Sequence, residues 1–533
     1  MSKDTFLKGA LILTVAGVLV KIIGSVNRIV LSRLLGGEGI GLYQMAYPIY
    51  LLALSISSAG IPVAISIIVA EKVARRDFRG ANRVFRISLA VLAATGVLFS
   101  VLLYFGAGWL VDSHFVRDPR AFYAIAALAP AIFFVTILSS YRGYFQGLQM
   151  MTPTAISQIA EQFVRVVTMI ALAYWLLPRG LEYAAAGASF GAGPGAAAGL
   201  LILIVYYWRQ SPKMKEQIES QPQIEQESGV SIITRIARLA IPVSLANIML
   251  PVVSNIDLLI VPARLEVAGF TVEQATELFG YLTGMAVALI NLPTILTASL
   301  AASLVPAVSE AFTLGKKERI YQRTATAMRI SNLITIPSFV GMYLLATPIS
   351  QMLYGTPNAG VPIAILSIGI FFLGVQQVTT GVLQGLGHTA IPVLNMVISA
   401  VVKVAMSWTL TAVPWLGIKG AAWATVVDFG IAAALNLYFV YRYVGFSVDM
   451  KDLIRTSVAA TVMAGIVILI YDKTMAVTLH NTLATLVSIS IGGLTYAIAL
   501  LAVGGVGSQD IEQIPRIGPR LAQTLRTLRL LRR

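Results

Sequence analysis

The sequence predicts an all-α integral membrane protein with about 14 transmembrane helices: two pseudo-symmetric six-helix lobes and two extra C-terminal helices. Three observations lead to this fold class. Of the 533 residues, 57% are hydrophobic and only 12% are charged, and the mean hydropathy is +0.80. Apolar runs of about 18 residues or more recur along the chain, each long enough to cross a bilayer about 30 Å thick. The first half of the chain also resembles the second.

The apolar runs define the predicted spans in chain order. They are 9–33, 41–69, 87–111, 121–144, 153–177, 184–208, 235–262, 278–307, 326–346, 361–383, 391–413, 418–441, 453–471 and 482–504. The second and eighth runs are long for one crossing and contain internal prolines, so we expect them to be bent or tilted.

Lysine and arginine orient these spans, because cytoplasmic loops retain positive charge. An even number of spans with the N-terminus inside collects the basic loops on one side. These cations are Lys72, Arg75, Arg76, Arg79, Arg83, Lys213, Lys215, Lys316, Lys317, Arg319, Arg323, Arg442, Lys451 and Arg455. The C-terminal tail, with six arginines after residue 515, belongs on the same side, either as a basic amphipathic helix on anionic lipid or as a disordered tail. Both termini are therefore expected to be cytoplasmic.

An internal repeat divides the chain. The stretch that begins at Tyr144 matches the stretch that begins at Val382, so that Gln-Gly-Leu at 146–148 aligns with Gln-Gly-Leu at 384–386 and Arg165 with Lys403. An offset that spans six helices preserves orientation, which makes the repeats parallel and puts the expected substrate path between them. The predicted domains are an N-lobe (1–208), a cytoplasmic linker (209–232), a C-lobe (233–442), two further helices (443–505) and a basic tail (506–533).

Four cations lie inside predicted spans: Lys21, Arg28, Arg165 and Lys403. Each costs about 2.5–3.5 kcal/mol at the bilayer centre, so we expect them to face a hydrated cavity or a partner. Lys21 and Arg28 belong to a face of the first span that also carries Gly17 and Gly24. Snorkelling toward the membrane interface is the alternative for both residues.

The span 153–177 carries a polar stripe. Gln158, Glu161, Gln162 and Arg165 follow the spacing i, i+3, i+4, i+7 and share one helical face. Glu161 and Arg165 can form an intrahelical ion pair. The stripe is therefore interpreted as a helix contact, as part of a hydrated wall, or as both, with Gln158, Glu161 and Arg165 as candidate substrate-binding residues.

Further polar residues occur in later spans. Asn255 shares a face with Ser244, Asn247 and Pro251, near two prolines that free backbone carbonyls, and it is a candidate binding residue. Asp257 is a candidate for ion coupling, with pairing to Arg264 as the alternative.

The span 391–413 also carries a polar face, which is formed by Asn395, Ser399, Lys403 and Ser407. Asp428 is a second candidate for ion coupling, or it neutralises Lys403. Because the intramembrane cations outnumber the carboxylates, the central compartment is expected to favour an anionic substrate.

The sequence lacks the residues that several classes of function require. The chain has no cysteine and three scattered histidines, so we expect no metal and no cofactor. No clustered acid and base groups indicate an enzyme. The net charge of +15 lies largely in the basic loops of a membrane protein, so no nucleic-acid partner is expected. No Walker motif is present, which leaves an ion gradient, the membrane potential or the substrate gradient as the energy source.

The N-terminal stretch with Gly36 to Gln44 and the Ser-x-x-Gly-x-Pro motif at 57–62 resembles the polysaccharide transport branch of the multidrug/oligosaccharidyl-lipid/polysaccharide exporter superfamily, in the subgroup of stage V sporulation protein B and related lipid II flippases. The resemblance covers essentially residues 1–505. It implies a V-shaped bundle with alternating access in the bacterial cytoplasmic membrane, with undecaprenyl-pyrophosphate-linked sugars as substrate. An arginine-rich first-helix motif of related flippases is altered here, with Lys21 retained as a cation but Asn27 and Arg28 in place of arginine and aspartate.

The resulting hypothesis is a flippase for a lipid II-like cell-wall or polysaccharide precursor. Its expected partners are the lipid-linked oligosaccharide, anionic membrane lipids and, as candidates, cell-wall synthesis enzymes. The alternatives are a cation-coupled multidrug or metabolite exporter of the same superfamily, which would need an acidic pocket, and a membrane-embedded transferase acting on the same lipids.

Overall fold

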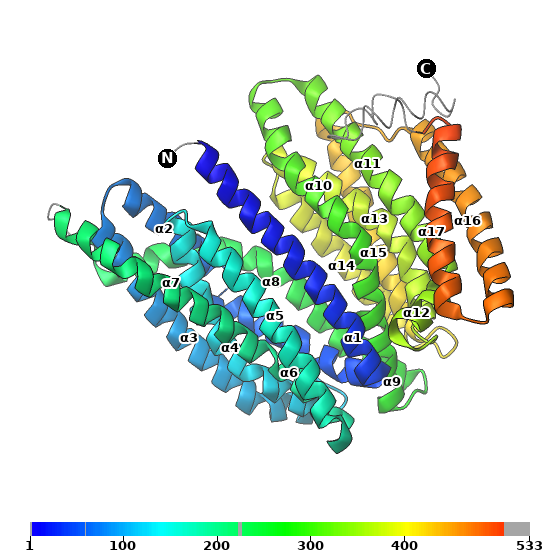
Figure 1. The fold of residues 1–533 in the computed structure, drawn as a ribbon, viewed down its shortest axis with the longest axis horizontal. Helices are drawn as coiled ribbons and strands as arrows, with labels where there is room; N and C mark the ends of the chain where they lie inside the picture. The colour runs from blue at the N-terminus through cyan, green and yellow to red at the C-terminus, as the bar shows by residue number, and fades with distance from the viewer. Residues whose placement is uncertain (1–2, 59, 222–225, 506–533) are drawn as a thin grey trace. The chain divides into compact units, whose positions relative to one another are not determined.

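The computed structural model describes residues 3–58, 60–221 and 226–505, and throughout these ranges the regular structure is helical (Figure 1). The prediction of an all-α membrane protein is confirmed. The helices pack into two compact units, residues 1–280 and 281–533, and each is described by itself. The predicted lobe boundary within residues 209–232 stays a prediction.

The first unit is formed by the helices that precede residue 280. They are α1 (Lys3–Ser58), α2 (Ile61–Ala74), α3 (Phe78–Asp112), α4 (Ala121–Gly147), α5 (Met151–Leu176), α6 (Leu181–Phe190), α7 (Ala192–Ser220), α8 (Gly229–Val267) and α9 (Val272–Phe279). A short 3-10 turn at Leu177–Arg179 joins α5 to α6.

The second unit begins within a π-helical segment, Gly280–Ala286. Its helices are α10 (Val287–Thr313), α11 (Lys317–Leu344), α12 (Ala346–Tyr354), α13 (Gly360–Gly385), α14 (Ala390–Leu410), α15 (Ile418–Val444), α16 (Met450–Thr478) and α17 (Asn481–Ala502). The predicted basic tail, 506–533, lies outside the described residues.

The number of candidate membrane spans is smaller than the predicted 14. Among the described residues, twelve helical stretches are long and apolar enough to cross a membrane, or thirteen if α11 and α12, bent by 80°, count as one broken span. The difference arises mainly at the start, where Val15–Ala74 is a single stretch of 60 residues. At about 1.5 Å per residue this stretch is roughly three times as long as the hydrocarbon layer is thick, so it contains more than one crossing.

A glycine divides α1. Gly36 has φ 66° and ψ −172° inside an otherwise helical segment, a combination that only glycine adopts without strain. It lies between the two spans, 9–33 and 41–69, that the sequence predicts. The helix therefore breaks where the Gly-Gly-Glu-Gly sequence allows it, and each part keeps about the length of one crossing.

Each unit has its own apolar core. In the first, the Phe85 ring on α3 lies 5.0 Å from the Tyr141 ring and 4.5 Å from the Tyr144 ring on α4, and 5.1 Å from the Tyr207 ring on α7. In the second, buried valines and leucines of α10, α13 and α15 form the corresponding cluster. The cores join α2, α3, α4, α7 and α8 in the first unit, and α10, α11, α13 and α15 in the second.

A close helix contact at a glycine occurs in each of the two units. A Cβ atom on Gly147 of α4 would lie 2.7 Å from Val69 Cβ of α2, and one on Gly385 of α13 would lie 2.7 Å from Val308 Cβ of α10. The two glycines belong to the Gln-Gly-Leu motifs that align in the sequence. Each of these two helix crossings therefore requires a residue without a side chain, as the predicted duplication implies.

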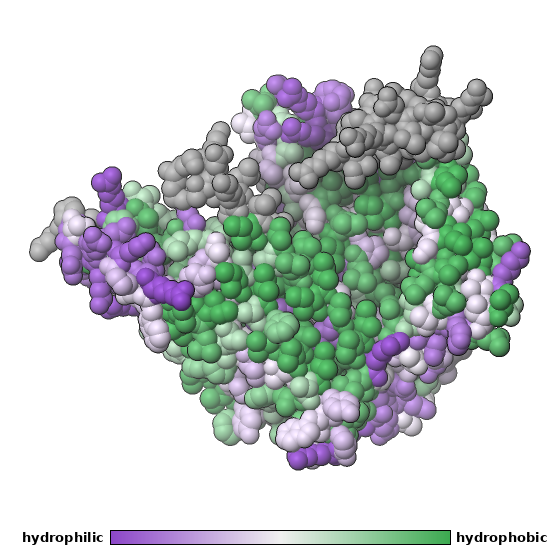
Figure 2. Space-filling view, in the orientation of Figure 1, coloured by the Kyte–Doolittle hydropathy of each residue, from purple (hydrophilic) through white to green (hydrophobic). Residues whose placement is uncertain are grey.

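Charged residues gather at the helix ends, whereas the middle of the helices is apolar (Figure 2). In the first unit, Glu71 at the end of α2 pairs with Arg235 of α8. Lys72 lies 3.4 Å from Glu227, which precedes α8. The hydrogen bond donated by the Ser231 hydroxyl, together with Lys72, holds the pKa of Glu227 below its ordinary value. These contacts tie the start of α8 to the end of α2.

The break in α1 can be tested by replacing Gly36 with alanine. A Cβ atom there would meet no neighbour, so the cost is backbone strain alone, about 1–3 kcal/mol. We expect Gly36→Ala to lower the thermal unfolding temperature of the purified protein. Gly17→Ala is the matched control, because Gly17 is helical and also meets no neighbour. Equal stability of the two variants would contradict a strained break at Gly36.

Candidate functional site

A row of glycines, from the N-cap of α7 through its first two turns, receives one face of α5. Cβ atoms on Gly191, Gly195 and Gly199 would lie 2.4 Å from Met169 Cγ, 2.7 Å from Arg165 Cβ and 3.0 Å from the Ser157 carbonyl oxygen, respectively. These glycines are spaced by four residues, as in small-x-x-x-small packing of membrane helices. Because α7 presents no side chain here, the backbones approach closely and the charged side chains of α5 are directed to the edge of the contact.

At this edge, two arginines share one carboxylate. Arg142 Nη2 of α4 donates to Glu161 Oε2 at 2.8 Å, and Arg165 Nη2 of α5 donates to Glu161 Oε1 at 2.6 Å. The side chains of Arg142, Glu161 and Arg165 are 18%, 13% and 19% exposed. The predicted intrahelical pair of Glu161 and Arg165 is thus present, with a second arginine that the sequence reading did not select. We call these three residues the arginine–glutamate cluster.

The arginine–glutamate cluster carries a net charge of +1. Its hydrogen bonds extend to Ser157, whose hydroxyl accepts from Arg142 Nε at 3.2 Å. Arg165 Nε, in contrast, is buried and has no hydrogen-bond partner. Uncompensated charge and an unsatisfied donor are both costly away from water. The arrangement is therefore electrostatically incomplete and suited to an anion.

Helix α1 lies along the same face of α5. A Cβ atom on Gly24 would lie 3.3 Å from Gln162 Nε2, and Asn27 Nδ2 lies 3.5 Å from Met169 Sδ. Gln162 belongs to the predicted polar stripe of α5, and Gln158, its neighbour in that stripe, is half-buried. The polar stripe is thus in part a helix contact, as one interpretation held.

Three tyrosines of α1 lie near Arg165 of the arginine–glutamate cluster. The Tyr43 and Tyr47 rings stack at 5.5 Å, and the Tyr47 and Tyr50 rings lie 5.9 Å apart. Arg165 interacts electrostatically with all three hydroxyls, and Arg28 with that of Tyr43. Arg28 and Arg165 therefore belong to one neighbourhood within the first unit.

Lys21 and Asn255 take part in other contacts of the first unit. Lys21 is exposed on α1, and its carbonyl oxygen accepts a hydrogen bond from Ser25 Oγ at 2.9 Å. Asn255 is buried on α8, where Nδ2 donates to the carbonyl oxygens of Pro48 and Pro251 at 2.8 Å each. Asn255 thus joins α8 to α1. Asp257, two residues further along α8, is half-buried.

The second unit contains a more neutral counterpart. The predicted face of α14 is buried throughout, and Lys403 is only 6% exposed. Ser399 Oγ donates to Asp428 Oδ1 of α15 at 2.5 Å. Asn395 Nδ2 donates to Asn436 Oδ1 at 2.8 Å. At the offset of 238 that relates Arg165 to Lys403, Glu161 corresponds to Ser399.

The sequence analysis missed Arg142 and the α7 glycines. Arg142 falls near the end of the predicted span 121–144, where a cation is equally expected at the interface. The glycines did carry a signal, because Gly191, Gly195 and Gly199 recur at intervals of four. Read with the polar stripe of α5, this spacing points to a close helix contact.

No grouping of three or more histidine, aspartate or glutamate side chains able to hold a metal ion occurs in the part of the chain that the structure describes. What the site offers chemically is positive charge, guanidinium donors and aromatic hydroxyls in an apolar helix bundle. These groups bind and orient an anion.

The fold and these features define a multi-pass, all-helical membrane protein with a polar interior. The model of the polysaccharide biosynthesis protein family matches residues 6–312, and the MatE model matches residues 281–409. The chain belongs to the polysaccharide biosynthesis protein family, within the multidrug/oligosaccharidyl-lipid/polysaccharide exporter superfamily.

Individual relatives are also similar to this chain over most of its length. Stage V sporulation protein B of Bacillus subtilis (strain 168) is 32% identical over 97% of this chain and 99% of its own length. Lipid II flippase MurJ of the same organism is 26% identical over 86% of each chain. A solved structure titled lipid II flippase MurJ, inward closed conformation, has a TM-score of 0.68 at 15% identity, covering 92% of this chain and 98% of that one. This structural match supports a shared fold.

The glycine contact between α5 and α7 makes a direct prediction. Gly195→Ala would bring a Cβ atom to 2.7 Å from Arg165 Cβ and 2.8 Å from the Glu161 carbonyl oxygen, so we expect a loss of about 1–3 kcal/mol in stability. In Gly193→Ala, the matched control, the nearest atom is 4.0 Å away. Thermal unfolding of both variants measures the difference, and an unaffected Gly195→Ala would rule out close packing at this face.

Proposed function

We propose that this protein is a flippase that moves a polyprenyl-pyrophosphate-linked oligosaccharide, a lipid II-like cell-wall or polysaccharide precursor, across the membrane by alternating access. Membership in the polysaccharide biosynthesis protein family supports a lipid-linked precursor as the substrate class. The arginine–glutamate cluster is the observation that carries the proposal, because it supplies half-buried positive charge for a pyrophosphate.

The geometry of the cluster fits a diphosphate. Arg142 and Arg165 come from different helices and reach the two oxygens of one carboxylate. Two guanidinium groups that converge on one small anionic group can also hold phosphate oxygens, which they bind with paired N–H donors. A pyrophosphate offers more acceptors and more negative charge than Glu161, so it competes for the arginines and reaches the unsatisfied Arg165 Nε.

The other candidate residues take supporting roles in the proposal. Arg28, in the same neighbourhood as Arg165, adds charge along the path. Lys21 and Lys403 bind the pyrophosphate at other points of the cycle, and Gln158 contributes hydrogen bonds to the headgroup. Asn255 holds α8 against α1. Asp257 and Asp428 remain the candidates for ion coupling.

The proposed setting is the bacterial cytoplasmic membrane with both termini in the cytoplasm. The excess of lysine and arginine in one set of loops supports this orientation. Anionic lipids on the inner surface, and cell-wall synthesis enzymes that supply or consume the substrate, are the proposed partners. The guanidinium groups of the arginine–glutamate cluster favour anion transport over export of cationic drugs.

The test is transport of a labelled lipid-linked oligosaccharide in proteoliposomes. Arg142→Gln removes the excess charge but leaves the pair of Glu161 and Arg165 in place, so the fold should tolerate it. Loss of a charge-assisted hydrogen bond worth about 1.5–3 kcal/mol predicts a transport rate lower by roughly 10- to 100-fold. Arg142→Lys should retain part of the activity, because the charge stays while the bidentate geometry is lost.

Arg209→Gln is the matched control, since Arg209 is exposed on α7. Size-exclusion chromatography establishes that each variant is folded. An Arg142→Gln protein that is folded and transports at the wild-type rate would refute the role of the cluster.

A further inference from the structure

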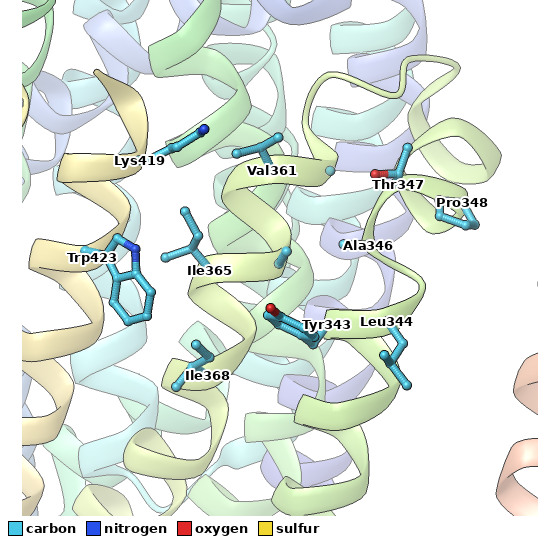
Figure 3. Close-up of a pocket in the computed structure, with 12 residues that line it drawn as sticks. Tyr343, Leu344, Ala346, Thr347, Pro348, Val361, Ile365, Ile368, Lys419 and Trp423 are labelled. Atoms are coloured by element: carbon cyan, nitrogen blue, oxygen red, sulfur yellow. The ribbon is translucent and has the colours of Figure 1, made fainter. Parts of the chain in front are cut away.

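A cavity of about 360 Å³ opens within the second unit. Its walls come from the end of α11, the start of α12, the start of α13 and the start of α15 (Figure 3). Lys419 and Val361 lie at one end, and Trp423 and Tyr343 flank Ile365. The cavity therefore combines one cation, two aromatic side chains and an aliphatic floor.

Several features assign this cavity to the membrane interface. Helix α12 is bent by 80° from α11, so it runs across the direction of a spanning helix. The start of α17 reaches the same level, because Asn481 Nδ2 donates to the Pro348 carbonyl oxygen at 3.0 Å. Lys419 is the second residue of α15, a candidate span. Helix ends that carry Trp, Tyr and Lys lie at the headgroup level.

The cavity depends on residues that differ between the two halves of the sequence. At the offset of 238 defined by Gly147 and Gly385, Val361 corresponds to Tyr123. In the first unit the Tyr123 ring lies 4.9 Å from the Tyr183 ring. The smaller valine removes an aromatic ring from the equivalent position in the second unit, which helps to keep the space open.

The charge beside the cavity also differs from the charge at the corresponding position in the first half of the sequence. Gly180 and Gly417 precede α6 and α15, respectively, and both have positive φ. Aligned on these glycines, Glu182 corresponds to Lys419. Lys419 is exposed and forms no ion pair with any residue in the described ranges. A cation without a carboxylate, beside an open cavity, provides charge complementarity to an anionic ligand.

We infer that this cavity binds the headgroup of an anionic phospholipid, with Lys419 pairing with the phosphate. The hydroxyls of Tyr343 and Thr347 and the indole N–H of Trp423 supply polar contacts at the glycerol level, where amphipathic side chains are favourable. One acyl chain continues along Ile365 and Ile368 of α13. The site belongs to one unit and is separate from the arginine–glutamate cluster, so it goes beyond the proposed transport function.

The test uses quenching of tryptophan fluorescence by brominated lipids. The protein, which has six tryptophans, is reconstituted in phosphatidylcholine vesicles with a minor fraction of phosphatidylglycerol, and one lipid at a time carries bromine on its acyl chains. The difference between wild type and Trp423→Phe isolates quenching at the cavity. We expect brominated phosphatidylglycerol to quench Trp423 more strongly than brominated phosphatidylcholine at the same mole fraction.

Substitutions at Lys419 then test the role of the cation. We expect Lys419→Gln to lower the preference for phosphatidylglycerol by about fivefold, and Lys419→Arg to retain it. Lys473→Gln, at another exposed lysine of the same unit, is the matched control and should leave the preference unchanged.

Three results would overturn the inference. Equal quenching of wild-type Trp423 by the two brominated lipids would show a groove without headgroup selectivity. An unchanged preference in Lys419→Gln would remove the cation from the site. Displacement of brominated phosphatidylglycerol by an equimolar lipid-linked oligosaccharide would identify a substrate site instead.

Discussion

One carboxylate shared by two guanidinium groups is the interaction on which this account depends. Glu161 neutralises only one of Arg142 and Arg165, so a positive charge remains within a bundle of apolar helices. Such a charge is stable only where water, an anion or a further polar group compensates it. The tyrosine row of α1 provides polar hydroxyls nearby, but no second carboxylate is part of the cluster. The residual charge gives the first unit a reason to bind an anion.

Close helix packing makes this arrangement available. The α7 glycines let α5 approach without side chains in between, which directs Glu161 and Arg165 toward α4 and α1. In the second unit, α14 corresponds to α5 in the sequence alignment but carries different side chains. Ser399 stands at the position of Glu161, and the side-chain amides of Asn395 and Asn436 are hydrogen-bonded to each other. Under the predicted duplication, a common scaffold would therefore carry one strongly charged and one more neutral polar interior.

The sequence predicted the fold class better than the contacts between side chains. Hydropathy and length sufficed for an all-helical membrane protein, and the spacing of Glu161 and Arg165 sufficed for their ion pair. Arg142 could not be assigned, because a cation near the end of an apolar run can reach the interface or turn inward, and tertiary packing decides which. The span count differed mainly because no loop separates the helical segments on either side of the break at Gly36, whereas the sequence suggested two separate runs.

The sequence predicts where a break or a polar face occurs, whereas the structure gives its backbone angles and its burial. Gly36 lies in a glycine-rich stretch that the sequence marked as a boundary, yet the backbone angles that make glycine necessary follow only from the structure. The polar face of α14 was predicted as a face, and the structure buries it, which amphipathicity alone does not require. In a membrane both lipid and protein interior are apolar, so hydropathy does not distinguish a lipid-facing residue from a buried one.

The most direct test of the central claim varies the ligand instead of the protein. Equilibrium binding of a glycan attached to polyprenyl pyrophosphate would be compared with binding of the same glycan on a polyprenyl chain that lacks the phosphates. An incomplete cationic cluster predicts that the pyrophosphate-linked ligand binds tighter by about tenfold or more, and that added salt reduces the difference. Equal affinities for the charged and uncharged ligands would contradict the account.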